Sequence, residues 1–510
     1  MKARNKGIMI SYVKIAVNMI CGMVLSSTLL KQLGDTEYGI YQTVSAFANY
    51  LILLEFGVGT VMIRNISMCR GHHADQEEIQ RNISTTWTLT CLLSVLLVAV
   101  SALFYCLIPL AYANAMTPSQ IQHGQNIFLI IVVYLLLNFL LHTVNAVIFS
   151  FEDYTYGSLQ SIWRTLLRCI LLIVLLQWLQ NAIVVAAVDL LISAVCLVSS
   201  LWYCRKRLKV TLHFGKCDPV ILRASVPLAV AVFLQGIVSQ ANNNVDKFLI
   251  GILLSPESVS LYSVALYIYS IFCSLSNVAS SMYVPVVTQH VGRGLTGREL
   301  SNHLITPCRL TALFGGLVLF GFVAVGRQFV EILYTKAYLA AWPMAIILIA
   351  PTYLDTVVEV LVYVLDAMNK RMVRSIVLIV TTIMNILLTI FCLNHWGVFS
   401  AAVATAVCTL IGPVFFMGIY YHRVLRIPVL WLFRQAFRGI LIYLVVGCCT
   451  AMGVSGLFEN VYASFIAGGL CFVLIVLGGY FLFGMNEAEK ITVRKFAHRI
   501  TEKCKKLPGR

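Results

Sequence analysis

The sequence predicts an all-α polytopic membrane protein of about 14 transmembrane helices, organised as two six-helix lobes related by a pseudo-two-fold axis along the membrane normal, with a C-terminal helix pair. Three observations predict this fold class: the composition, the length of the apolar runs and the distribution of basic residues. Of the 510 residues, 60% are hydrophobic and only 11% are charged, whereas soluble domains are about 45–50% apolar and about 25% charged. This composition excludes a cytosolic enzyme, a nucleic-acid-binding protein and a secreted disulfide scaffold.

Apolar runs of transmembrane length follow one another along the whole chain. A helix needs about 20 residues to cross a hydrocarbon layer of roughly 30 Å. The segments of this length lie at about 8–30, 39–63, 84–109, 122–149, 158–177, 182–204, 221–252, 257–288, 303–326, 342–367, 374–393, 398–421, 436–456 and 462–483. The last two spans carry no charged residue beyond their ends, which predicts peripheral helices that face lipid.

Basic residues predict the orientation of these spans. With the N-terminus in the cytoplasm, 28 of the 37 Lys and Arg residues fall in inner segments and only Lys31, Arg327 and Lys336 in outer ones. This is the positive-inside distribution of membrane proteins, and it explains the net charge of +16 without nucleic acid. An even number of spans then places both termini in the cytoplasm.

Two long basic connections divide the spans into groups. The predicted organisation is an N-lobe of six spans, a cytoplasmic linker, a C-lobe of six spans, a last pair of spans and a basic cytoplasmic tail. These parts cover residues 1–205, 206–220, 221–421, 422–483 and 484–510. Because six is even, two six-span units share one orientation, as repeats related by an axis along the membrane normal do. Basic and apolar residues alternate in the tail, which predicts an amphipathic helix on the inner leaflet.

Polar residues recur inside spans 1, 2 and 4 and again inside spans 7, 8 and 10, an offset of six each time. A polar face is costly in lipid, so we expect these faces to point into the bundle or a water-filled cavity. The residues predicted to line this cavity, besides two arginines discussed below, are Lys14, Asn18, Asn49, Gln235, Asn242, Asp246, Lys247 and Asn277. For Lys247, which adjoins Asp246, a structural ion pair with another helix is an equal alternative.

Three stretches near the ends of predicted spans carry motifs: Leu33–Tyr41 (LGDTEYGIY), Leu54–Gly59 (LEFGVG) with Arg64 after it, and Asn244–Gly251 (NVDKFLIG). These motifs resemble the Wzx-type O-antigen and oligosaccharide transporters, a family of polysaccharide biosynthesis flippases within the multidrug/oligosaccharidyl-lipid/polysaccharide exporter superfamily. One departure is Glu55, where the family more often has Asp.

The resemblance implies a function and a setting. It implies a flippase that moves an undecaprenyl-diphosphate-linked oligosaccharide from the inner to the outer leaflet of the bacterial cytoplasmic (inner) membrane, for surface polysaccharides such as the lipopolysaccharide O-antigen. The expected mechanism is alternating access. The expected partners are the lipid-linked oligosaccharide, membrane lipids, and the polymerase and glycosyltransferases of the same pathway. No cofactor and no enzymatic activity of the chain are expected.

Arg164 and Arg168 are the strongest candidates for binding the cargo phosphates. They lie four residues apart within span 5, so they share one face of the helix, and guanidinium groups suit bidentate contacts with phosphate. We expect them, with Lys14, to face the cavity. The alternative is that they pair with acids across the bundle or extend their side chains to the interface.

Three acids of span 10, Asp355, Glu359 and Asp366, fall at spacings of four and seven residues, which predicts one face of one helix. Such a stripe is suited to carrying protons or a cation and coupling transport to an ion gradient. The equal alternative is that these acids neutralise Arg164 and Arg168. His142 on span 4 is expected to be a hydrogen-bonded polar contact rather than a titrating group.

The sequence lacks the motifs of several other functions. There is no phosphate-binding loop of the form GxxxxGK[ST] for an ATP-driven motor, and no Cys/His cluster with metal-ligand spacing. A multidrug or small-solute exporter of the same superfamily is the main alternative function. A membrane-embedded polysaccharide polymerase is disfavoured, because the longest predicted outer loop, about 327–341, is short.

Overall fold

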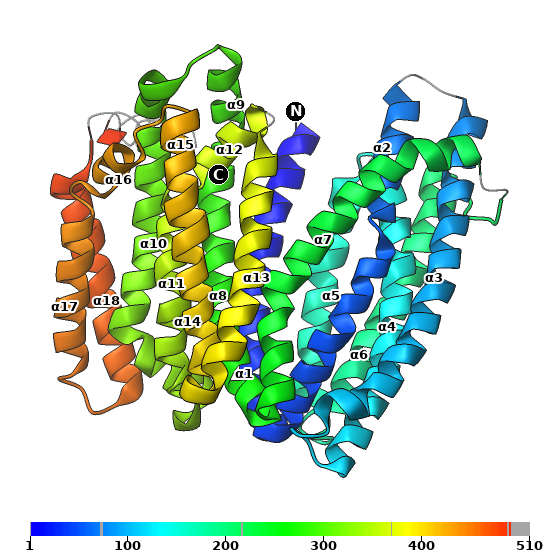
Figure 1. Ribbon diagram of the computed structural model, residues 1–510, viewed down its shortest axis with the longest axis horizontal. Coiled ribbons are helices and arrows are strands. Elements are labelled where there is room, and N and C mark those ends of the chain that lie inside the picture. Colours follow the sequence, from blue (N-terminus) through cyan, green and yellow to red (C-terminus); the bar gives the residue numbers. More distant parts are fainter. Residues whose placement is uncertain (1, 72–74, 216–217, 369, 487–488, 491–510) are drawn as a thin grey trace, which may run out of the picture. The chain divides into compact units, whose positions relative to one another are not determined.

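The computed structural model describes residues 2–71, 75–215, 218–368, 370–486 and 489–490. Within these ranges every regular element is a helix and none is a strand (Figure 1), which confirms the predicted all-α membrane fold. The chain forms two compact units, residues 1–263 and 264–510. The predicted six-span boundaries and the symmetry between lobes stay predictions. The tail residues 491–510, predicted to form a surface helix, lie outside the described ranges.

The first unit contains α1 to α7 and the start of α8. Its helices α3, α4 and α6 run side by side (Figure 1), and α1 packs on α4, α5 and α7. The elements are α1 (Lys2–Ala48), η1 (Asn49–Glu55), α2 (Val58–Gly71), α3 (Gln76–Tyr112), α4 (Pro118–Ser150), α5 (Tyr154–Leu175), α6 (Ala182–Tyr203), η2 (Cys204–Leu208), α7 (Pro219–Leu253) and α8 (Pro256–Ser281).

The second unit contains the rest of α8 and all later elements. The elements are α9 (Val284–Gly292), α10 (Gly297–Tyr334), η3 (Lys336–Tyr338), α11 (Ala341–Val357), α12 (Val360–Ala367), α13 (Arg371–Trp396), α14 (Phe399–Thr409), η4 (Leu410–Phe416), α15 (Met417–Val424), α16 (Val429–Phe437), α17 (Leu441–Ser455), α18 (Val461–Gly479) and η5 (Tyr480–Gly484).

The predicted number of 14 membrane spans stays a prediction. Among the described residues, 11 segments are long and apolar enough to cross a membrane, or 13 if each of two bent helix pairs forms one span. One segment, Val13–Gly71, has 59 residues, almost three times the length that a bilayer requires. Its backbone breaks at Gly34, where φ is 77° and ψ is 175°, a conformation that glycine adopts without steric cost. The predicted spans 8–30 and 39–63 lie on either side of this break.

The motif Leu33–Tyr41 joins α1 to the start of α8. The Thr36 hydroxyl donates a hydrogen bond of 2.7 Å to Glu257, and the Ser260 hydroxyl donates one of 2.6 Å to the carbonyl of Asp35. At Gly39 the two helices come so close that a Cβ atom would lie 2.0 Å from the carbonyl oxygen of Pro256. The glycine is therefore required by helix packing at this position.

The other two motifs also make contacts between helices of the first unit. Phe56 and Gly57 both have positive φ (47° and 67°), and they turn the chain from η1 into α2. A Cβ on Gly57 would lie 2.4 Å from Val232 of α7. On α7, Asp246 accepts a hydrogen bond of 2.7 Å from the Tyr262 hydroxyl of α8.

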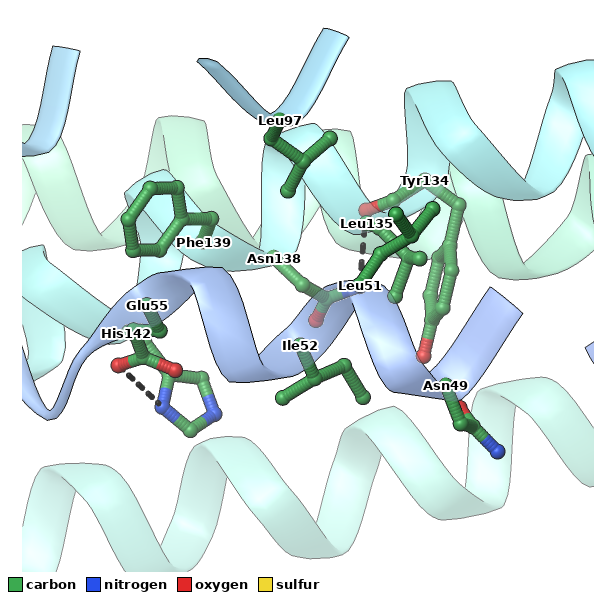
Figure 2. A pocket seen from close by; sticks show the side chains of 10 residues that line it. All are labelled: Asn49, Leu51, Ile52, Glu55, Leu97, Tyr134, Leu135, Asn138, Phe139 and His142. Atoms are coloured by element: carbon green, nitrogen blue, oxygen red, sulfur yellow. Dashed lines mark hydrogen bonds and ion pairs between the residues drawn. The ribbon is translucent and has the colours of Figure 1, made fainter. Parts of the chain in front are cut away.

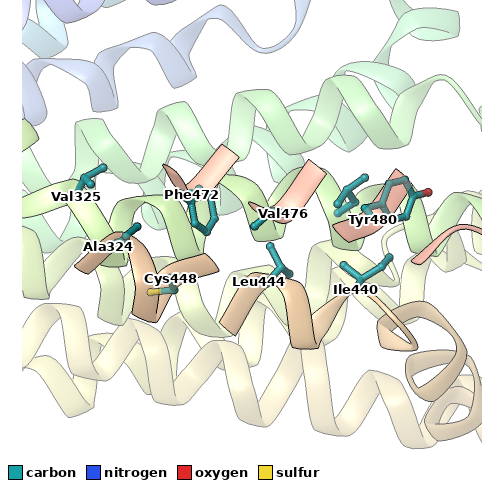
Figure 3. Close-up of a cluster of buried hydrophobic side chains, with 10 residues drawn as sticks. Ala324, Val325, Ile440, Leu444, Cys448, Phe472, Val476 and Tyr480 are labelled. Carbon is teal, nitrogen blue, oxygen red and sulfur yellow. The ribbon is translucent and has the colours of Figure 1, made fainter. Parts of the chain in front are cut away.

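The C-terminal helices pack on α10 through an apolar cluster. Leu444 and Cys448 of α17 face Phe472 and Val476 of α18, with Val325 of α10 beside them (Figure 3). The outward faces of α17 and α18 are apolar and exposed, as expected for helices in contact with lipid.

Arg309 lies at one end of this C-terminal packing and is only 1% exposed. Its guanidinium donates to the Glu489 carboxylate at 2.8 Å and to the carbonyl oxygens of Arg438 and Gly484 at 2.6 and 2.5 Å. One side chain of α10 thereby links the α16–α17 connection to the chain that follows η5.

Candidate functional site: a charged cavity in the first unit

A polar cavity of about 330 Å³ lies among helices of the first unit. Asp153, directly before α5, caps the helix because its carboxylate accepts from the Tyr156 backbone N–H. Asn181, directly before α6, accepts from the Ile183 backbone N–H in the same way. These two helices and α1, η1 and α4 line the cavity with Tyr41, Ser45, Asn49, Ile131, Tyr134, Leu135, Arg164, Arg168, Ala186, Asp189 and Ile192. The two arginines, one turn apart on α5, therefore share one cavity.

Arg168 is neutralised by Asp189 of α6. Its Nε atom lies 2.5 Å from Asp189 Oδ1, and a second guanidinium nitrogen lies 2.8 Å from Oδ2. The Tyr41 hydroxyl of α1 lies 3.5 Å from the same Oδ2. The Arg168 side chain is 32% exposed and that of Asp189 is 13% exposed, so this ion pair forms part of the cavity wall.

Arg164, in contrast, has only neutral hydrogen-bond partners. One of its guanidinium nitrogens donates to Asn138 Oδ1 at 2.9 Å and to the Ser193 hydroxyl at 3.1 Å. No carboxylate of the described residues forms an ion pair with it within 4.0 Å. An uncompensated cation within a membrane span is costly and typical of a functional site. The cavity therefore carries one net positive charge from these three ionised groups.

A smaller pocket of about 170 Å³ adjoins this cavity and shares Asn49, Tyr134 and Leu135 with it. Tyr134, Asn138 and His142 follow one another along α4 at its wall (Figure 2). Nδ1 of His142 lies 3.5 Å from Glu55 Oε1. The polar contact expected for His142 thus involves Glu55 of η1, which sequence reasoning had not paired with it.

The remaining predicted cavity residues do not all meet at this site. Asn49 lines both cavities, and Asn18 on α1 accepts a hydrogen bond of 2.7 Å from Thr165, next to Arg164. Lys14 is half-buried and does not line the cavity. The side chain of Asn242 lies outside the described part of the chain.

The predicted polar residues of α7 and α8 make other contacts or are exposed. Lys247 donates to Gln42 Oε1 at 3.3 Å, which joins α7 to α1, and Asp246 is buried against Tyr262. Gln235 and Asn277 are exposed. These residues are therefore not gathered in the 330 Å³ cavity.

The three acids predicted on one helix face lie on both sides of a break. Helix α11 ends at Val357, α12 begins at Val360, and the two are bent by 49°. Between them, hydrogen bonds of the tighter i to i−3 type, such as Val358 N–H to Asp355 O, replace the α-helical pattern. The prediction of one continuous helix is therefore wrong, whereas the shared face of the three acids stays a prediction.

Two of these acids have arginine partners within their own unit. Asp355 accepts from Arg374 of α13 at 2.7 Å and 3.3 Å, and Asp366 accepts from Arg371 at 2.9 Å. Glu359 differs, because its Oε2 atom is buried and has no hydrogen-bond partner among the described residues.

Sequence reasoning missed Asp189, Tyr41 and Ser193 as site residues. Asp189 is the only charged residue in the predicted span 182–204, and a lone carboxylate in a membrane span indicates a functional or paired group. Asp189 could therefore have been identified from the sequence. Tyr41 and Ser193 could not, because isolated tyrosines and serines are common in membrane helices.

A family model identifies the family of this chain. The chain belongs to the family described as polysaccharide biosynthesis protein, whose model matches residues 4–291. This range contains the whole cavity and all three motifs. No curated protein sequence matches the chain.

Solved structures share the fold at low sequence identity. The lipid II flippase MurJ in an inward closed conformation is 14% identical, with a TM-score of 0.70, over 93% of this chain and 98% of that one. An inward-facing multidrug resistance MATE family transporter of the MOP superfamily is 12% identical, with a TM-score of 0.64, over 83% and 99%. A MOP superfamily transporter from Pyrococcus furiosus is 13% identical, with a TM-score of 0.52, over 84% and 96%.

Proposed function

We propose that this protein is a flippase that translocates an undecaprenyl-diphosphate-linked oligosaccharide from the inner to the outer leaflet, for export of a surface polysaccharide such as the O-antigen. The observation that carries the proposal is Arg164, an arginine in a membrane span with neutral partners only, at the wall of a polar cavity. The family of polysaccharide biosynthesis proteins and the MurJ-like fold support the same function.

The cavity chemistry matches the two parts of such a headgroup. A diphosphate diester carries two negative charges, and arginine binds phosphate oxygens through charge-assisted hydrogen bonds. The glycan is a set of hydroxyl groups, for which Asn49, Ser45 and Tyr134 offer donors and acceptors at the cavity wall. The remaining predicted cavity residues, Lys14 and the polar groups of α7 and α8, would contact the cargo at other steps of alternating access.

Energy for the cycle would come from an ion gradient, and Glu359 is the strongest candidate of the three acids. Asp355 and Asp366 already have arginine partners, whereas the buried Oε2 of Glu359 has none among the described side chains. The protein would act in the bacterial cytoplasmic membrane with both termini inside, beside the glycosyltransferases and the polymerase of its pathway.

The second candidate function is export of a small solute or drug. It is favoured by the MATE transporters among the structures that share the fold and by the Glu55–His142 pair, which adds an acid to the smaller pocket. A cationic drug would be repelled by Arg164, so this function predicts that removing the arginine leaves transport intact or improves it.

The test is surface polysaccharide in cells that depend on this gene. Arg164→Ala is expected to reduce the surface polymer at least about tenfold, since one charge-assisted hydrogen bond to phosphate is lost. Arg327→Ala, which changes an exposed arginine of α10, is the matched control and should leave the polymer unchanged. Normal polymer from Arg164→Ala at normal protein levels would rule out the proposed cargo site.

A further inference from the structure

Arg168 and Asp189 form an ion pair whose position differs from that of a permanently buried pair. The Arg309–Glu489 pair is 1% and 4% exposed, as expected for a pair that holds a fold together. In contrast, Arg168 is 32% exposed, and both members of its pair line the 330 Å³ cavity. A ligand in the cavity can therefore reach the Arg168 guanidinium without unfolding the helices.

The charges in the cavity do not match those of the proposed headgroup. Arg164 contributes one uncompensated positive charge, and the Arg168 charge is cancelled by Asp189. A diphosphate diester carries two negative charges, and burying an unpaired charge in a medium of low dielectric constant is costly. A second cation is needed, and Arg168 lines the same cavity one helical turn from Arg164.

We propose that Asp189 is a displaceable counter-ion, so that Arg168 exchanges the Asp189 carboxylate for one phosphate while Arg164 binds the other. This inference rests on the proposed function and names how its site selects a diphosphate. Only hydrogen bonds are exchanged in this step, and no covalent bond changes.

The cavity has the space and the groups for this exchange. A single water requires only roughly 10–15 Å³ of such a cavity, so a cavity of about 330 Å³ has room for a group of several atoms. The displaced carboxylate keeps a partner, because the Tyr41 hydroxyl already lies 3.5 Å from Asp189 Oδ2. In the empty site, Asp189 removes the repulsion between two arginines at i and i+4.

The counter-ion also sets selectivity. A monoanion can bind Arg164 alone and leaves the Arg168–Asp189 pair in place. A dianion gains the second arginine only by breaking that pair, so its extra affinity over a monoanion is the Arg168–phosphate interaction less the Arg168–Asp189 interaction. A site of this kind binds the diphosphate tightly enough to take it up and weakly enough to release it.

The experiment measures binding of two synthetic probes to the purified full-length protein in detergent. One probe is a diphosphate diester with a short isoprenoid on one side and a hexose on the other, and the second is the matching phosphodiester with a single negative charge. The variants are Asp189→Asn, Arg168→Gln and the double variant Asp189→Asn/Arg168→Gln. The control is Asp218→Asn, which breaks the ion pair with Arg81 in the same unit but outside this cavity.

The exchange predicts a specific pattern of affinities. Asp189→Asn should raise the affinity for the diphosphate at least about tenfold and change the affinity for the monoanion much less. Arg168→Gln should remove the preference for the diphosphate, since the gain needs Arg168, and the double variant should lose that preference for the same reason. The double variant should bind both probes more tightly than Arg168→Gln does, because Arg168→Gln leaves the Asp189 carboxylate unpaired in the cavity. The double variant also replaces the pair by two neutral side chains that can still hydrogen-bond, so it tests the exchange even if a single variant fails to fold.

Two results would overturn the inference in distinguishable ways. If the double variant binds the diphosphate as tightly as the unaltered protein, the Arg168–Asp189 pair is static and the exchange is wrong, while the proposed function stands. If the unaltered protein binds neither probe, or binds both equally, the proposed function fails and the exchange fails with it.

Discussion

Arg168 of α5 donates two hydrogen bonds to Asp189 of α6, whereas Arg164, one turn earlier on the same helix, donates only to the neutral side chains of Asn138 and Ser193. The two arginines of this cavity thus differ: an ion pair cancels the charge of Arg168, and no carboxylate of the described residues cancels that of Arg164. The neighbouring helices cause this difference, because α6 presents a carboxylate to one arginine and a hydroxyl to the other.

Asn138→Asp is expected to abolish surface polysaccharide while leaving the protein folded. The new carboxylate would replace the amide oxygen that lies 2.9 Å from Arg164 and would cancel the charge available to the cargo. A pair of this kind does not destabilise the helix contact, so the melting temperature should stay equal or rise. Surface polymer and protein level are measured in cells, and the melting temperature is measured in detergent.

Asn145→Asp is the matched control for this change. It adds the same charge two turns further along α4, where Asn145 accepts a hydrogen bond from Ser200 outside both cavities. It should retain export. If Asn138→Asp exported as much polymer as Asn145→Asp, a free charge on Arg164 would not be required for transport.

Gly39→Ala is expected to destabilise the first unit by about 1–3 kcal/mol, the usual cost of overpacking. Its Cβ would lie 2.0 Å from the carbonyl oxygen of Pro256, and neither backbone can move without separating α1 from α8. Thermal unfolding in detergent measures the effect. Gly71→Ala serves as the comparison, since no atom of the described residues lies within 4 Å of its Cβ. Equal melting temperatures would show that the contact at Gly39 does not contribute to stability.

Arg309→Ala is expected to lower the stability of the second unit by about 3–5 kcal/mol, because it leaves the Glu489 carboxylate buried without its cation. Glu489→Gln should cost less, since an amide oxygen still accepts from the guanidinium. Lys336→Ala removes a pair whose lysine is 82% exposed, and such pairs contribute about 0–1 kcal/mol. Melting curves of the three variants rank their losses of stability. An Arg309→Ala protein as stable as Lys336→Ala would show that the Arg309–Glu489 pair does not stabilise the second unit.

Glu359→Gln is expected to reduce flipping that is driven by an ion gradient by at least about tenfold, with little effect on cargo binding. The amide cannot take up and release a proton, and it binds cations more weakly than a carboxylate does. Proteoliposomes with and without an imposed gradient provide the measurement. Glu331→Gln, next to the exposed Lys336, is the control, and undiminished gradient-driven flipping by Glu359→Gln would exclude this carboxylate from coupling.

Much of the fold follows from the sequence because the bilayer imposes a simple rule. A run of about 20 apolar residues has one stable conformation in lipid, a helix whose backbone groups bond to one another. The break at Gly34 and the bend after Val357 were not predicted as such. Both depend on a few backbone torsions that the surrounding helices stabilise.

The sequence by itself determined the class of fold, the family resemblance and the choice of Arg164 and Arg168 as cargo-binding candidates. Charges in an apolar span are rare enough to be identified without coordinates. Only the tertiary structure decided which of the two arginines is free. That outcome depends on whether a carboxylate 21 residues away, on the next helix, comes within 3 Å of one guanidinium or the other, and distances of this size are set by how the helices pack and not by the order of residues along the chain.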